Sequence, residues 1–260
     1  MSAILLESDL VHYEVLGRGK PVLFLHSWLG SWRYWIPNMQ YVSNKFRAYS
    51  MDMWGFGDSA KNGKYSIKEQ TELLVQFLDK LGIFKIAVVG HGLGALLAIE
   101  LAKIMPEIVD RILAVSIPFE SEMITPLLIN NRASDNMDVL VSKGMEVDAV
   151  INEIPKTDDV AVISISNELS RMAISTITNL DVGCLFVHGK NDPFISLPNN
   201  YQILQLPEQH HEIIFEQSGH FPMLEESSKF NRLLIDFLTL ETGKNVRELS
   251  LKEEWKRIVR

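Results

Sequence analysis

The residue types that carry out acid–base chemistry occur in three short, glycine-containing segments of the chain. Gly90-His91-Gly92-Leu93-Gly94 lies between a predicted strand and a predicted helix. Gly189-Lys190-Asn191-Asp192 directly follows another predicted strand, and Ser218-Gly219-His220-Phe221-Pro222 comes last. A histidine can exchange a proton near neutral pH, and a carboxylate beside it can orient its ring. These segments therefore hold residue types that acid–base catalysis can use.

Alternating strands and helices must position these segments, and this alternation is typical of an α/β protein. Continuous apolar runs predict strands over 46–51, 84–89, 111–117, 184–188 and 212–215. Residues 10–16 and 21–26 flank a glycine-containing turn, which predicts an N-terminal hairpin. A capping box at Ser66 and Glu69 starts a predicted helix that Gly82 ends, and further helices are predicted over 93–105 and 227–240.

The alternation breaks between residues 118 and 178. This stretch is helical in pattern, interrupted by polar residues and rich in methionine, including Met123, Met137, Met145 and Met172. We expect it to form a small helical cap, with residues 1–117 and 179–260 forming the core. The charged tail at 241–260 carries a few apolar residues, Leu249, Trp255 and Ile258, with which it can dock on its own domain or on a partner.

The order of these elements resembles the α/β-hydrolase fold, a mostly parallel central sheet flanked by helices. Four motifs support the resemblance over nearly the whole chain: the Gly90–Gly94 turn, the Asp192 segment, the His220 segment, and His26-Ser27-Trp28-Leu29-Gly30. In this superfamily a serine on a sharp strand-to-helix turn is the nucleophile. The resemblance extends to esterases, lactonases and carbon–carbon bond hydrolases, and implies a small apolar ester or related carbonyl substrate.

The resemblance also assigns roles to residues. Asp192 corresponds to the acid that orients the histidine, and His220 to the general base. The backbone N–H groups of Trp28 and Leu93 correspond to the oxyanion hole. Ser27 stands where the family usually has glycine, and we expect Ser27, Trp54 and Phe221 to contact substrate.

Gly92 occupies the position of the nucleophilic serine and has no side chain with which to attack a carbonyl. Three explanations compete. In the first, the natural protein has a serine at position 92 and this chain is a nucleophile knockout. In the second, Gly92 is natural and the protein is a small-molecule receptor or pseudoenzyme. In the third, Gly92 is natural and His220 and Asp192 act as a dyad that abstracts a substrate proton or activates a water, which the gap beside Gly92 admits. The retained acid, base and oxyanion positions favour the knockout, and we then expect the chain as it stands to show no appreciable serine-type ester hydrolysis. Ser27 and Ser116 are disfavoured as substitute nucleophiles because neither lies on the turn.

The composition of the chain limits which other functions it can have. The net charge is −8 without a concentrated basic face, which excludes a nucleic-acid footprint. No apolar run approaches the ~20 residues of a membrane span, and no signal peptide is visible. The one cysteine, Cys184, excludes an internal disulfide and favours the cytoplasm. No residue spacing suggests a metal, and we expect no cofactor, a small-molecule ligand, and an oligomeric state that the sequence leaves open.

Overall fold

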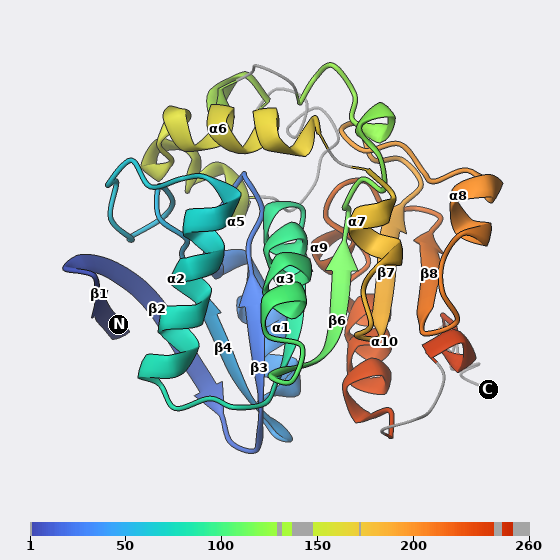
Figure 1. Ribbon diagram of the computed structural model, residues 1–260, viewed down its shortest axis with the longest axis horizontal. Coiled ribbons are helices and arrows are strands. Elements are labelled where there is room, and N and C mark those ends of the chain that lie inside the picture. Colours follow the sequence, from blue (N-terminus) through green and yellow to red (C-terminus); the bar gives the residue numbers. More distant parts are fainter. Residues whose placement is uncertain (1, 129–131, 137–147, 172, 242–245, 252–260) are drawn as a thin grey trace, which may run out of the picture.

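Eight strands form one mixed sheet within the part of the chain that the computed structural model describes, residues 2–128, 132–136, 148–171, 173–241 and 246–251 (Figure 1). Their order in space is β1-β2-β4-β3-β5-β6-β7-β8. The strands are β1 (Ser2–Leu6), β2 (Asp9–Gly17), β3 (Lys20–Leu25), β4 (Phe46–Met51), β5 (Ile86–His91), β6 (Val109–Val115), β7 (Cys184–Gly189) and β8 (His210–Phe215).

The six strands from β3 to β8 run parallel, whereas β1 and β2 are antiparallel to their neighbours. Every residue of β5 and β7 is buried, as expected for strands covered on both faces. The predicted mostly parallel sheet flanked by helices is therefore confirmed.

The predicted N-terminal hairpin is wrong. Strand β4 lies between β2 and β3, and pairs antiparallel with β2 and parallel with β3. The real hairpin joins β1 to β2 through Glu7 and Ser8, both with positive φ. The glycine-containing turn after β2 reverses the chain, but the ladder hydrogen bonds of β2 go to β4, a pairing that local sequence does not reveal.

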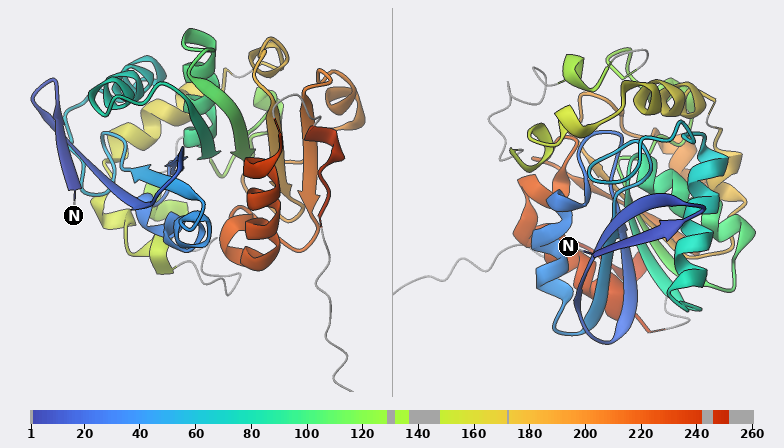
Figure 2. Two further views of the ribbon diagram at one scale, coloured as in Figure 1. Left: turned by 90° about the horizontal axis from the view of Figure 1, so that it is seen from below. Right: turned by 90° about the vertical axis from the view of Figure 1, so that its left-hand side faces the viewer.

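Helices cover both faces of the sheet (Figures 1 and 2). Helices α2 (Ile67–Lys80) and α3 (Leu93–Ile104) lie on one face, and α1 (Ile36–Val42) and α10 (Ser227–Thr239) on the other. The predicted capping box at the start of α2 is confirmed, with Ser66 and Glu69 bonding to each other's backbone N–H. None of the described helices has the length and apolar character needed to cross a membrane.

Shorter helical segments complete the described chain. They are η1 (Trp32–Trp35), η2 (Ser121–Met123), η3 (Ala133–Asn136), α5 (Asp148–Ile151), η4 (Ile154–Lys156), α6 (Asp159–Leu169), α7 (Ser175–Thr178), α8 (Asn200–Leu204), α9 (Pro222–Glu225) and η5 (Val246–Glu248). The η5 segment of the tail docks on the core, where the Arg247 guanidinium donates to the carbonyls of His210, Leu206 and Pro207. Trp255 and Ile258 lie outside the described residues.

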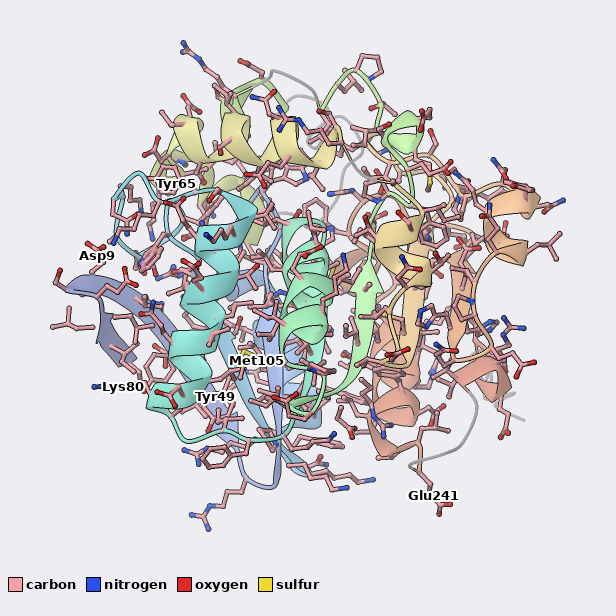
Figure 3. The ribbon with its side chains drawn as sticks, in the orientation of Figure 1. Asp9, Tyr49, Tyr65, Lys80, Met105 and Glu241 are labelled. Carbon is pink, nitrogen blue, oxygen red and sulfur yellow. The ribbon has the colours of Figure 1, made fainter. Side chains whose placement is uncertain are left out.

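Helix α6 crosses the carboxyl edge of the sheet, in the stretch predicted as a cap (Figure 1). Tyr65 lies just before α2, below α6 in the view of Figure 3. Its hydroxyl donates to Asp158 at 2.6 Å. Arg33 binds Glu153 at 2.9 Å, so η4 is also tied to the core. Of the predicted cap residues, 129–131, 137–147 and 172 lie outside the described part of the chain, including Met137, Met145 and Met172; the cap boundaries stay a prediction.

Candidate active site

Asp192 and His220 lie in contact at the carboxyl edge of the sheet. Asp192 follows β7 and His220 follows β8, and His220 Nδ1 lies 2.8 Å from Asp192 Oδ2. The backbone N–H groups of Phe194 and Ile195 donate to the other carboxylate oxygen at 2.8 and 3.1 Å. Because an ionised carboxylate only accepts, Nδ1 carries the proton and Nε2 is left with a free lone pair.

The electrostatics of the pair favour an ionised Asp192. Burial by itself raises the pKa of this carboxyl, but the neighbouring His220 and the two backbone N–H donors outweigh it. The net effect lowers the pKa of Asp192 below its ordinary value. The aspartate is therefore charged at neutral pH and can stabilise a protonated His220 ring.

His220 Nε2 is buried, and no atom of the described residues forms a hydrogen bond with it. The His220 side chain is only 1% exposed. A buried lone pair on an oriented imidazole is the arrangement that a general base requires.

Two residues whose positioning role the sequence did not predict hold the backbone around His220. Glu225 accepts the N–H groups of Gly219 and Phe221, on either side of His220, at 2.5 and 2.9 Å. The Ser116 hydroxyl donates to the His220 carbonyl at 3.2 Å, and Ser116 itself has φ +48°. Ser116 therefore braces the backbone of His220. A glutamate five residues after the histidine is the only sequence signal for this bracing.

Gly92 lies on the strand-to-helix turn, immediately after β5 and before α3. Its backbone has φ +50° and ψ −107°, a conformation that strains residues other than glycine. The turn is tight, since a Cβ on Gly90 would lie 2.3 Å from the Gly94 carbonyl oxygen. The local fold therefore has the geometry of a nucleophile turn without a side chain at its apex.

The two predicted oxyanion donors lie on either side of this turn. Leu93 is the first residue of α3, so its N–H has no partner within the helix. His26 accepts the Met53 N–H at Nε2, which leaves Nδ1 to donate to the Ser27 carbonyl at 2.6 Å. Because the peptide group is trans and planar, the Trp28 N–H points the opposite way from that carbonyl. Within the described structure neither the Trp28 nor the Leu93 N–H donates a hydrogen bond.

The gap predicted beside Gly92 is already filled. A Cβ on Gly92 would lie 2.2 Å from Ser27 Oγ and 3.5 Å from Trp28 Cδ1. In this structure Ser27 Oγ occupies the space in which the missing hydroxymethyl group was expected to leave room for a water.

Aromatic rings surround His220. The centroids of Phe194 and Trp28 lie 5.1 and 5.8 Å from the His220 ring. Phe221 packs 4.9 Å from His91 and 5.1 Å from His220, as part of the core behind the base. This packing supports a structural role for Phe221 rather than the predicted contact with substrate.

Three further side chains near this site, those of Trp54, Tyr34 and His91, are also buried. The Trp54 carbonyl accepts from Gln70, and its ring lies 5.3 Å from Lys64 Nζ. Tyr34 Oη lies 3.1 Å from His91 Nδ1. Burial, and then the nearby His220, hold the pKa of His91 well below its ordinary value, so this ring is neutral.

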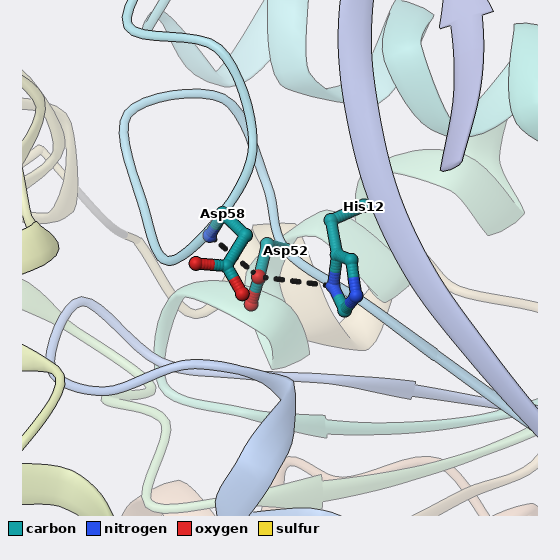
Figure 4. A group of neighbouring side chains, drawn as sticks. All are labelled: His12, Asp52 and Asp58. Atoms are coloured by element: carbon teal, nitrogen blue, oxygen red, sulfur yellow. Dashed lines mark hydrogen bonds and ion pairs between the residues drawn. The ribbon is translucent and has the colours of Figure 1, made fainter. Parts of the chain in front are cut away.

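His12, Asp52 and Asp58 form a compact group (Figure 4) next to His26, whose Nε2 lies 4.0 Å from Asp52 Oδ1. Their ligand atoms lie within 4.8 Å of one another. However, Asp52 accepts the N–H groups of Trp32 and Asp58, both at 2.9 Å, and Asp58 binds Arg33 at 2.7 Å. Since protein donors already engage both carboxylates, we assign the group a structural role.

A mostly parallel sheet that presents a histidine–aspartate pair beside a strand-to-helix turn is typical of the α/β-hydrolase class. A family model described as alpha/beta hydrolase fold matches residues 20–149, half of the chain. The chain belongs to this family.

Relatives and solved structures agree with the assignment. The chain is 25% identical over 87% of its length to a 2-hydroxy-6-oxo-6-(2'-aminophenyl)hexa-2,4-dienoic acid hydrolase of Metapseudomonas resinovorans, 87% of which is covered. It is 22% identical over 88% of its length to a pimeloyl-[acyl-carrier protein] methyl ester esterase of Vibrio cholerae, 98% of which is covered.

Similar solved structures include a serine-to-glycine mutant of the N-acyl homoserine lactonase AidH complexed with N-hexanoyl homoserine lactone. It has a TM-score of 0.79 at 18% identity, with 91% of this chain and 96% of that chain covered. The enol-lactonase from Burkholderia xenovorans LB400 has a TM-score of 0.79 at 18% identity, with 92% and 100% covered. At these identities the likeness shows the fold.

Proposed function

We propose that the protein hydrolyses a small, mainly apolar carbonyl compound, a carboxylic ester, lactone or related substrate. His220 is the general base, Asp192 orients it and stabilises its protonated form, and the Trp28 and Leu93 N–H groups bind the developing oxyanion. The observation that carries this proposal is the buried, unbonded Nε2 of His220 opposite an Nδ1 fixed on Asp192.

The chemistry named for the relatives supports the substrate class. An ester, a lactone and the carbon–carbon bond of an oxo-dienoic acid differ in the group that leaves. All three reactions begin with addition to a carbonyl carbon, and all three develop negative charge on its oxygen. A site with one base and two N–H groups that donate to none of the described residues suits that shared step.

Gly92 itself cannot supply the attacking hydroxyl. The sequence offers two sources, a serine lost from position 92 in a knockout and a water activated by His220. Loss of the hydroxyl at Gly92 is also the observation that favours the alternative function, a receptor that binds a small carbonyl compound without hydrolysing it.

A substrate panel tests the proposal. The unmodified chain is assayed with a short-chain aryl ester, an N-acyl homoserine lactone and an oxo-dienoic acid, and thermal melting is followed with the same compounds. We expect turnover of at least one compound above the buffer rate. A melting shift without turnover of any compound would establish the receptor function instead, and neither turnover nor a shift would reject the proposed substrate class.

A further inference from the structure

The Ser27 hydroxyl occupies the place from which a nucleophilic side chain would leave the turn. Its Oγ lies 2.2 Å from the position of a Cβ on Gly92, and its Cβ lies 3.2 Å from that position. The two residues are 65 positions apart in the sequence but adjacent in space. A serine is thus present beside the apex of the turn, on the oxyanion loop instead of the turn itself.

Ser27 Oγ is buried and, like His220 Nε2, forms no hydrogen bond with the described residues. A buried hydroxyl without a hydrogen-bond partner is unfavourable, and such a group in a folded protein often has a functional role. Both unbonded atoms belong to the cluster around Trp28, whose ring contacts the Gly92 region and packs 5.8 Å from the His220 ring. The unbonded atoms of this cluster also include His91 Nε2; among them, Ser27 Oγ is the hydroxyl that can give up a proton, and His220 Nε2 belongs to the ring that Asp192 holds.

The backbone of Ser27 is fixed on both sides. Its N–H donates to Tyr34 Oη at 2.7 Å, and its carbonyl accepts from His26 Nδ1 at 2.6 Å. Both partner side chains are fully buried. Rotation about χ1 is the movement left to the hydroxyl, so Oγ can leave the space beside Gly92 without a shift of the loop. Catalytic hydrogen bonds often tighten only when substrate is bound.

We propose that Ser27 is the nucleophile, so that serine and glycine have exchanged places between the turn and the oxyanion loop. This inference rests on the proposed function. Ser27 Oγ bonds to the carbonyl carbon while its proton passes to His220 Nε2. His220 then protonates the leaving oxygen as the carbon–oxygen bond of the ester breaks. Water attacks the acyl-Ser27 ester, its proton passes through His220 to Ser27 Oγ, and the carboxylic acid departs.

The oxyanion donors suit this exchange. In the nucleophile turn, one donor is the N–H of the residue that follows the nucleophile. For Ser27 that residue is Trp28, and Leu93 remains as the second donor from the N-terminus of α3. The Trp28 and Leu93 N–H groups can therefore both remain oxyanion donors when Ser27 is the nucleophile.

A fluorophosphonate probe tests the proposal. Ser27 Oγ bonds to phosphorus, fluoride leaves, and the proton goes to His220, so the adduct is read by intact mass and located by peptide mapping. We expect one adduct on Ser27, and Ser27→Ala reduces labelling to background and ester turnover by at least ~100-fold. Ser50→Ala is the matched control, since Ser50 is also buried but its hydroxyl already donates to the Phe24 carbonyl; it retains labelling.

The exchange double variant, Ser27→Gly with Gly92→Ser, moves the adduct to the peptide that carries position 92. In Gly92→Ser alone, the new Cβ lies 2.2 Å from the present position of Ser27 Oγ and displaces that hydroxyl, so we expect no gain in turnover. A large gain from Gly92→Ser alone would support the knockout and overturn the proposal, as would labelling of folded Ser27→Ala at an undiminished level. Turnover that requires His220 but survives Ser27→Ala rejects Ser27 and leaves the proposed function standing.

Discussion

His220 depends on residues from four segments of the chain. Asp192 fixes its ring, Glu225 and Ser116 fix its backbone, and Trp28 packs beside it. The sequence predicts the acid–base pair because the Gly-His-Phe-Pro segment and the Asp192 turn both follow strands. It does not predict the bracing contacts or the place of Ser27 Oγ, because these depend on side-chain directions across the sheet edge.

Removing the brace of Glu225 should slow turnover without weakening substrate binding. In Glu225→Ala the N–H groups on either side of His220 lose their acceptor, and the base leaves its aligned position. We expect kcat to fall about 10-fold with little change in KM. Glu225→Gln keeps an acceptor oxygen and should lie between the two. Steady-state kinetics check this, and an unchanged kcat in Glu225→Ala would show that the brace is dispensable.

The interactions that lower the pKa of Asp192 stabilise the folded state, and this stabilisation is lost at acidic pH. Because the folded pKa lies below the unfolded one, the contribution is present above the unfolded pKa and is lost as pH falls through the folded value. The difference in free energy of unfolding between the unmodified chain and Asp192→Asn should therefore shrink below about pH 4. Urea unfolding from pH 6 to pH 3 measures it. Asp181→Asn, at an exposed carboxylate, is the control, and a pH-independent gap for Asp192→Asn would contradict the shift.

At the scale of elements, the buried parallel strands and the capped helix α2 follow from local patterns, because apolar runs and a capping box are encoded in adjacent residues. The order β2-β4-β3 is not encoded locally. It depends on which strand edge β4 meets when the sheet assembles. The same limit applies to the stretch above the sheet, whose contacts with Arg33 and Tyr65 join residues about 100 positions apart.

The hydrogen bond between Tyr65 and Asp158 should stabilise the attachment of α6. Partial burial, and then the bond to Asp158, raise the pKa of Tyr65 to about 12, so the hydroxyl remains a donor at neutral pH. Tyr65→Phe should lower the free energy of unfolding by about 0.5–1.5 kcal/mol. Tyr41→Phe, on an exposed tyrosine of α1, controls for loss of a hydroxyl. Equal effects of the two substitutions in urea unfolding would show that the bond adds nothing.

At the scale of the whole molecule, the family and the mostly parallel sheet could be predicted from the sequence, as could the segments that carry the acid and the base. What the sequence does not predict is how loops from distant segments fill space beside Gly92. Position 92 lacks the hydroxyl that the family has there, and position 27 carries a hydroxyl where the family usually has glycine. Only their contact in the fold relates the two.

The central claim is that His220 acts as a general base on a carbonyl substrate. The most direct measurement is kcat/KM for the best substrate of the panel, compared between the unmodified chain and a folded His220→Ala variant. A positioned base contributes about 10²–10⁴-fold to the rate, so we predict a loss of at least ~100-fold. An unchanged kcat/KM in His220→Ala would contradict the account.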